Sequence, residues 1–221
     1  QVRRSREAKG AITAFVHGPA YDYVEGEAAA AYGGRLKRFR RQVVHVRPGV
    51  FVMFDDVAAQ NAATFQWLLH AYDRIQVDET ATAPVLRIRR DPAAMNVYLL
   101  LPGGLAITQT DRYDPEPESG EWKNTWHLTA ATQQPEQQAH FLTVFLPHRV
   151  GAEETLPRVE RAEGRGALGV RLLFPDGTEE VVAFRTADRG TVECAGVRDS
   201  ARVFAVGRKD GKETRRLRVT E

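Results

Sequence analysis

Short apolar segments divided by turn residues recur along the whole chain, and this pattern constrains the fold more than any other feature of the sequence. Turn signals such as Pro102-Gly103-Gly104, Pro175-Asp176-Gly177 and Lys209-Asp210-Gly211 separate the segments. Strands at intervals of about 8 to 12 residues are typical of an all-β sandwich or barrel. The strands that the pattern predicts span residues 11–16, 43–46, 50–54, 64–69, 85–89, 95–101, 105–110, 122–131, 141–146, 168–174, 180–184, 191–194, 202–206 and 214–219. The predicted fold class is therefore all-β, a large antiparallel β-sandwich (supersandwich-like), with a smaller sandwich portion allowed at the C-terminus.

One predicted hairpin ends in two adjacent acids. The apolar run 43–46 breaks at Pro48-Gly49 and resumes at 50–54, directly before Asp55 and Asp56. Neighbours in a strand face opposite ways, so these two carboxylates cannot form a facing acid/base pair. We expect one to face inward and pair with a nearby arginine while the other meets solvent. Their predicted role is structural.

Helix is scarce, and no shift in composition divides the chain into independent domains. Residues 27–32 have helical propensity, but Gly26 and Gly33-Gly34 limit them to a turn or two. A softer boundary falls near Gly151. We expect residues 1–150 to form the main sandwich. Residues 151–221 should form hairpins that either complete it or build a small β subdomain.

Composition excludes some classes of protein. The 31 Lys and Arg residues nearly balance the 29 Asp and Glu residues, which argues against a protein built chiefly to bind nucleic acid. No apolar run approaches the roughly 20 residues of a transmembrane helix. Cys194 is the only cysteine, and we interpret it as a buried, small apolar residue. The chain starts at Gln1 and has no visible signal peptide, so we expect that it is cut from a longer one.

Two groups of residues are candidates for ligand binding. The segment 35–41 carries five positive charges in seven residues, and its arginines could hold the carboxylates or sulfates of an acidic polysaccharide. A solvated strand edge is the favoured interpretation, because Lys and Arg block pairing at such edges. The aromatic candidates for stacking on sugar rings are Tyr21, Tyr23, Tyr113, Trp122 and Trp126, although core packing of at least one tryptophan is favoured.

No metal site is predicted. The six histidines are scattered, and no pair of them has HxH or HxxxH spacing. His70 ends an apolar strand, where a packed histidine with a satisfied hydrogen bond is favoured over a ligand. We therefore expect no bound structural zinc.

Several segments, taken in order, resemble the heparinase II/III-like polysaccharide lyases. The resemblance covers roughly residues 10 to 150, is faint beyond them, and lies in the order and spacing of the segments rather than in any one motif. The segments are 21–28 (YDYVEGEA), Ala31-Tyr32, Arg41, 47–57 (RPGVFVMFDDV), 65–70 (FQWLLH) and 141–147 (FLTVFLP).

The resemblance implies the C-terminal β-sandwich region of such a lyase, packed against an N-terminal (α/α) toroid that is missing here. Full-length relatives cleave uronate-containing polysaccharides by β-elimination. Their catalytic Tyr, Asn and His lie in the toroid, and their zinc site lies at the start of the sandwich in an HxHxD-type segment and a later His-Asn pair. None of these motifs appears here, so no catalytic residue and no cofactor is expected in this chain. The residues that could contact substrate are Tyr21, Tyr23, Arg41 and His70.

These observations lead to two hypotheses of different classes. The first is a lyase sandwich module that is inactive alone, serves as a scaffold and cleft wall, and works in the periplasm or outside the cell. The alternative is a stand-alone carbohydrate-binding or structural β-sandwich domain. Exposed, coplanar Trp122 and Trp126 would favour the alternative, whereas a bare apolar patch on one sheet face would favour the module.

Overall fold

Antiparallel strands form nearly all the regular structure of this protein. The computed structural model describes residues 9–80, 83–113 and 124–220, and the all-β prediction is confirmed within them. The only helices there are two 3-10 turns, η1 (Ala29–Tyr32) and η2 (Glu153–Thr155). The first falls inside the segment for which a turn or two was predicted.

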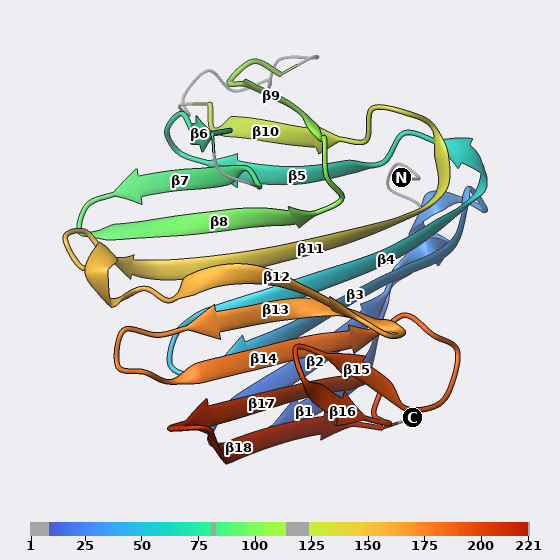
Figure 1. Ribbon diagram of the computed structural model, residues 1–221. Coiled ribbons are helices and arrows are strands. Elements are labelled where there is room, and N and C mark those ends of the chain that lie inside the picture. The colour runs from blue at the N-terminus through green and yellow to red at the C-terminus, as the bar shows by residue number, and fades with distance from the viewer. Residues whose placement is uncertain (1–8, 81–82, 114–123, 221) are drawn as a thin grey trace.

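A large sheet of eight strands runs through the middle of the molecule (Figure 1). Its strands lie in the order β1-β2-β3-β4-β11-β8-β7-β6, and all neighbours are antiparallel. Their bounds are β1 (Ala11–His17), β2 (Tyr21–Glu27), β3 (Leu36–Val46), β4 (Val50–Ala63), β6 (Gln76–Asp78), β7 (Val85–Arg90), β8 (Ala93–Leu101) and β11 (Glu136–Arg149).

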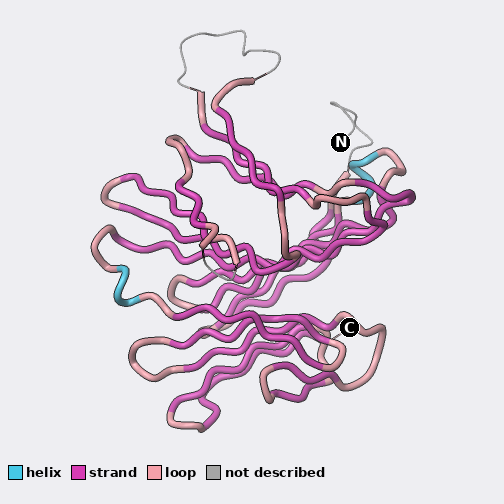
Figure 2. The backbone as a smooth tube through the Cα atoms, turned by 45° about the horizontal axis from the view of Figure 1, so that its top comes forward, coloured by secondary structure: helices cyan, strands magenta, loops and turns pink. Residues whose placement is uncertain are grey.

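Three smaller sheets accompany the large one, and Figure 2 shows them on either side of it. A three-stranded sheet has the order β5-β10-β9, with β5 (Gln66–Ala71), β9 (Ala106–Thr110) and β10 (Trp126–Ala131). A five-stranded sheet consists of β12 (Arg158–Gly164), β13 (Ala167–Leu173), β14 (Glu179–Arg185), β17 (Val203–Lys209) and β18 (Lys212–Val219). A two-stranded hairpin joins β15 (Val192–Cys194) to β16 (Val197–Asp199).

The middle of the central sheet, around β4, is buried on both faces, so the molecule has three layers there. One face packs on the five-stranded sheet, where Val52 and Phe54 of β4 meet Val182 and Phe184 of β14. The rings of Phe54 and Phe184 stack with centroids 4.9 Å apart. Met53 and Val57 of β4 point the other way, into the core beneath the three-stranded sheet. Alternate side chains of a strand face opposite sides, which explains why the apolar run Val50–Phe54 has no polar interruption.

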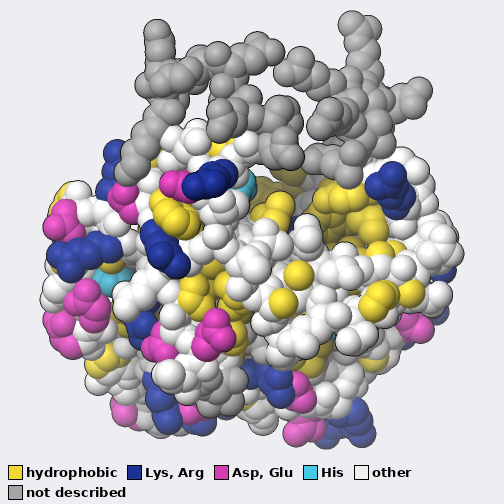
Figure 3. Space-filling model, turned by 90° about the horizontal axis from the view of Figure 1, so that it is seen from above, with side chains coloured by type: hydrophobic (Ala, Val, Ile, Leu, Met, Phe, Trp, Pro, Cys, Tyr) yellow, Lys and Arg dark blue, Asp and Glu magenta, His cyan; other side chains and the backbone are white. Residues whose placement is uncertain are grey.

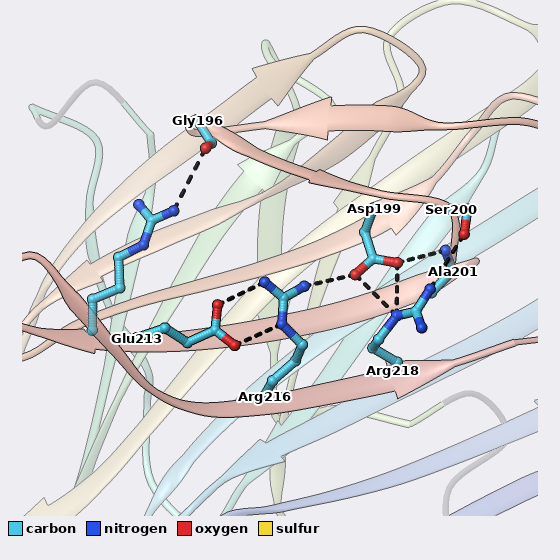
Figure 4. A network of polar contacts seen from close by, with 8 residues as sticks. Gly196, Asp199, Ser200, Ala201, Glu213, Arg216 and Arg218 are labelled. Atoms are coloured by element: carbon cyan, nitrogen blue, oxygen red, sulfur yellow. Dashed lines mark hydrogen bonds and ion pairs between the residues drawn. The ribbon is translucent and has the colours of Figure 1, made fainter.

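The five-stranded sheet brings its own small core and a polar anchor. Cys194 is fully buried in this core, as the sequence predicts. Asp199, at the end of β16, accepts hydrogen bonds from the backbone N–H of Ala201 and from Arg216 and Arg218 of β18 (Figure 4). This network fixes the β15–β16 hairpin to the outer strand of the sheet. Residues after Gly151 thus share one core with the central sheet.

Several predicted strands need correction. The sequence pattern missed β2, β6 (Gln76–Asp78), β12 and β16 (Val197–Asp199), and it started β10 too early, since the described strand begins at Trp126. The basic segment 35–41 was interpreted as a strand edge, but β3 pairs with β2 on one side and β4 on the other. Acidic side chains on those two strands pair with three of its arginines.

Candidate functional site

The candidate site is the part of the central sheet that the three-stranded sheet leaves uncovered, which we call the open face. Strand register aligns its side chains in rows that cross β1 to β4. One row holds His17, Asp22, His45 and Phe51, and the next holds Phe15, Val24, Val43 and Met53. Beyond them Arg41 pairs with Asp55. Rows two residues apart along a strand are about 7 Å apart, so Arg41 and His45 lie about 14 Å from each other on one surface.

Asp22 is the centre of the polar row. Its carboxylate accepts hydrogen bonds from His17 Nδ1 at 2.7 Å and His45 Nδ1 at 3.1 Å, and Arg47 Nη2 lies 2.6 Å away. Partial burial acts to raise the pKa of Asp22, but the bonds from Arg47, His17 and His45 outweigh it and hold that pKa well below its usual range. The cluster is therefore an ionised carboxylate that orients two imidazole rings.

An apolar hollow adjoins this cluster. It has a volume of about 330 Å³, and its apolar lining comes from Phe15, Val24, Val43 and Phe51. The His45 ring stacks on Phe51 with centroids 4.3 Å apart, while Phe15 is 67% exposed. An apolar floor with charged groups at its rim is the usual form of a small-molecule or sugar site.

Arg41 bounds the open face on its other side. Its Nε and Nη2 atoms each lie 2.7 Å from one oxygen of Asp55, and the Asp55 side chain is buried. Burial raises the pKa of the Asp55 carboxyl, and Arg41 opposes that rise. The prediction that one of the adjacent acids faces inward onto an arginine is confirmed. Asp55 is structural, and the Arg41 side chain remains 48% exposed.

The second acid, Asp56, faces the opposite side of β4 from Asp55. Arg38 lies 2.6 Å from its carboxylate and His140 lies 3.3 Å from it. Burial acts to raise the pKa of Asp56, but the bonds from His140 and Arg38 lower it to about 2. Together with the pairing of Arg40 with Glu25 at 3.9 Å, these contacts neutralise much of the basic run. The run is thus chiefly a set of cross-strand ion pairs.

Tyr21 and Tyr23, two of the predicted substrate contacts, lie between the layers. They are 3% and 1% exposed. The Tyr21 hydroxyl donates to Glu180 Oε2 at 2.5 Å, and the Tyr23 hydroxyl lies 2.9 Å from Glu25 Oε2. Burial, and then the adjacent glutamate, raises the pKa of both phenols. Both rings pack on the side of the five-stranded sheet, so a ligand on the open face would not reach their hydroxyl groups.

His70 lies in a third place. It is exposed in β5, opposite His127 of β10, and the two rings are 5.7 Å apart. Tyr113 packs edge-on against His127 at 4.7 Å. The structure therefore places the four predicted residues on two sheets, with Tyr21, Tyr23 and Arg41 on the central sheet and His70 on the three-stranded sheet, and it brings only Arg41 to the open face. That any of the four contacts substrate stays a prediction. Trp122 lies outside the described residues, and Trp126 is partly exposed.

The donor set of the Asp22 cluster does not fit a zinc ion. Both histidines bond to Asp22 through Nδ1, and the Arg47 guanidinium occupies the space beside the same carboxylate. Zinc needs several neutral or anionic ligands around one point, and the positive charge of Arg47 would repel a zinc ion bound there. Within the described ranges, no three His, Cys, Asp or Glu side chains converge to hold a metal.

Sequence reasoning missed the Asp22 cluster because its members are far apart along the chain. The signal that could have revealed it is strand register. Once β1 and β2 are placed as a hairpin, His17 must face Asp22, and once β2 pairs with β3, Asp22 must face His45. Placing β2 was the step that failed, since its sequence YDYVEGE is rich in acids.

No protein-family model matches the sequence, and no curated protein matches it. Solved structures share its fold, an antiparallel β-sandwich of the heparinase III type. Heparan sulfate lyase HepC from Pedobacter heparinus aligns with a TM-score of 0.57 and 12% identity over 82% of this chain. A heparinase III structure aligns with a TM-score of 0.56 and 13% identity over 89% of this chain.

This chain spans less than a third of each of those proteins, at 29% and 27% of their lengths. The resemblance stated from the sequence is thus confirmed for the fold. Separately, no helix in the described part of the chain is long and apolar enough to cross a membrane.

Proposed function

We propose that this chain is the C-terminal β-sandwich module of a heparinase II/III-like polysaccharide lyase. In the full-length enzyme it would stand beside an N-terminal (α/α) toroid and act on a uronate-containing polysaccharide in the periplasm or outside the cell. The observation that carries the proposal is the shared fold, which extends over 82% and 89% of this chain in two lyase structures.

The open face supports a role as one wall of the substrate cleft. Phe15 and Ile12 are 67% and 76% exposed, and Val24 and Val43 continue the apolar surface across β2 and β3. Bare apolar surface bordered by charged side chains marks a contact site. Arg41 at one side and the Asp22 cluster with Arg47 at the other could receive an acidic sugar chain laid across the strands.

The chain is expected to be inactive alone. β-Elimination needs a group that neutralises the uronate carboxylate and a base that removes the proton at C5, while the C4–O bond to the leaving sugar breaks. Tyr21 and Tyr23 are buried and have raised pKa values, so neither can act as that base. Without a positioned base, such a reaction is slower by orders of magnitude. The family's zinc, likewise, is proposed to lie upstream of this chain.

Product formation tests the proposal. Each elimination creates a C4–C5 double bond conjugated to a carboxylate, which absorbs in the ultraviolet. The purified chain should give no such signal with heparan sulfate, alginate or chondroitin, whereas the longer protein that its gene encodes should give it with one of them.

If the longer protein gives no signal with any of the three, the lyase assignment fails, and the alternative of a stand-alone carbohydrate-binding or structural domain replaces it. A signal from the chain alone that disappears on replacing His70 or Tyr23 would place the active site within this chain and refute its inactivity.

A further inference from the structure

Two arginines lie against aromatic rings at one end of the three-stranded sheet. The Arg90 guanidinium carbon is 3.8 Å from the centre of the Tyr72 ring, and that of Arg74 is 5.4 Å from the Trp126 ring. Tyr72 and Arg74 come directly after β5, and Trp126 opens β10 opposite Ala71, the last residue of β5. Arg90 is the last residue of β7, which lies to the left of β5 in Figure 1. The two arginine–ring pairs therefore lie near the ends of β5 and β7 and the start of β10.

This cluster faces solvent. Tyr72 is 58% exposed, both arginines are exposed, and Trp126 is partly buried. Figure 3 looks down on this side of the molecule and shows Lys and Arg side chains next to hydrophobic ones. A large exposed aromatic ring under an arginine is not needed for the core, because the inner side of the same sheet already packs through Trp67 and Leu128.

The stacking leaves the arginine donors free for a ligand. A ring covers the flat side of a guanidinium, whereas its N–H groups point outward in the plane and can bind carboxylate or sulfate. Within the described ranges, neither Arg74 nor Arg90 has a carboxylate at ion-pair distance. Other exposed arginines do: Arg89 pairs with Asp91 at 2.8 Å, and Arg87 pairs with Asp78 at 3.0 Å.

Asp91, the residue after Arg90, pairs with Arg89 instead. Each aromatic ring restricts the arginine above it, so less side-chain entropy is lost when an anion binds. The result is two oriented guanidinium groups, each beside an aromatic ring.

We propose that Tyr72, Arg74, Arg90 and Trp126 form a binding site for an acidic polysaccharide, separate from the open face. Carboxylate or sulfate groups of the polymer would bind the two guanidinium edges, and a sugar ring would contact the exposed part of Tyr72. The choice of a polysaccharide over another polyanion rests on the proposed function. The site would hold a polymer on the module independently of cleavage.

Binding of heparan sulfate by the purified chain tests the site. In a titration calorimeter at low salt, Arg74→Gln/Arg90→Gln should weaken binding about tenfold. It should also reduce the slope of the log binding constant against log salt concentration by about two. Tyr72→Leu keeps both charges but removes the ring under Arg90, and it should weaken binding about threefold. The matched control is Arg158→Gln/Arg198→Gln, which removes one exposed arginine from β12 and one from β16 and should change binding less than twofold.

Equal losses in the two double variants would mean that only overall charge matters, and would overturn the site. No binding by the wild type, or equal binding of neutral dextran, would also overturn it. Tighter binding of DNA than of heparan sulfate would overturn the assignment to a polysaccharide. None of these outcomes touches the lyase proposal, which depends on product formation by the longer protein.

Discussion

The hydrogen bond from Tyr21 to Glu180 joins two layers of the molecule, and its removal should measurably loosen the sandwich. Tyr21 belongs to β2 of the central sheet and Glu180 to β14 of the five-stranded sheet. Glu180 is fully buried, and its other partner is Arg215, whose Nε lies 2.5 Å away. In Tyr21→Phe the carboxylate loses one of its two partners without a change in ring packing.

A hydrogen bond to a charged group contributes about 1.5–3 kcal/mol, so we expect Tyr21→Phe to lower the free energy of unfolding by about 2 kcal/mol. For a chain of this size, that corresponds to a fall in Tm of about 4–8 °C. Urea unfolding followed by tryptophan fluorescence measures the loss, and the slope with urea should not change.

Tyr98→Phe is the matched control. Tyr98 packs against the same core, but its hydroxyl has no hydrogen-bond partner among the described residues, so the change should stay within about 0.5 kcal/mol. In a Glu180→Gln background the bond becomes neutral, and Tyr21→Phe should then cost only about 1 kcal/mol. An equal cost in both backgrounds, or a cost no larger than that of Tyr98→Phe, would refute the reasoning.

Two further predictions concern packing and pH. In Gly169→Ala the new Cβ would lie 2.2 Å from the backbone oxygen of Val182, so the free energy of unfolding should fall by about 3 kcal/mol. Gly49 has open space around it, so Gly49→Ala should be neutral or slightly stabilising in the same urea assay. The pKa of Asp56 is lowered to about 2, so its ion pairs stabilise the folded state above about pH 4 and lose this effect as pH falls toward 2. Wild type should therefore lose about 1–2 kcal/mol more than Asp56→Asn between pH 4 and pH 2, and parallel pH profiles of the two proteins would contradict the assignment.

The sequence was enough to predict the central hairpin, because the apolar runs 43–46 and 50–54 are short and the turn residues Pro48-Gly49 separate them. It could not predict that β4 is buried on both faces, since a continuous apolar run alone does not say what covers each side. Strands rich in charge were missed for a physical reason. In β12, with sequence RVERAEG, ion pairs such as Arg161–Glu163 at 3.1 Å replace apolar packing on the exposed side.

The candidate site was harder to predict than the fold. Tyr21 and Tyr23 look like sugar-stacking residues in the sequence, but Glu180 and Glu25 supply buried partners for their hydroxyls. Such partners lie far away along the chain, so the sequence alone could not distinguish a core tyrosine from a surface one. Conversely, Arg90 lies 18 residues after Tyr72 and Trp126 lies 52 residues after Arg74, and only the fold brings each arginine to its ring.

The division of β2 between two surfaces restricts how this protein can change length during evolution. Tyr21, Tyr23 and Glu25 face the five-stranded sheet, and Asp22 and Val24 face the other way. One residue inserted or deleted in the short turn 18–20 would exchange the two sets, forcing the ionised Asp22 into the core and exposing both tyrosines. Changes of two residues would preserve both sets. Natural homologues should therefore vary in length at this turn by even numbers, or not at all.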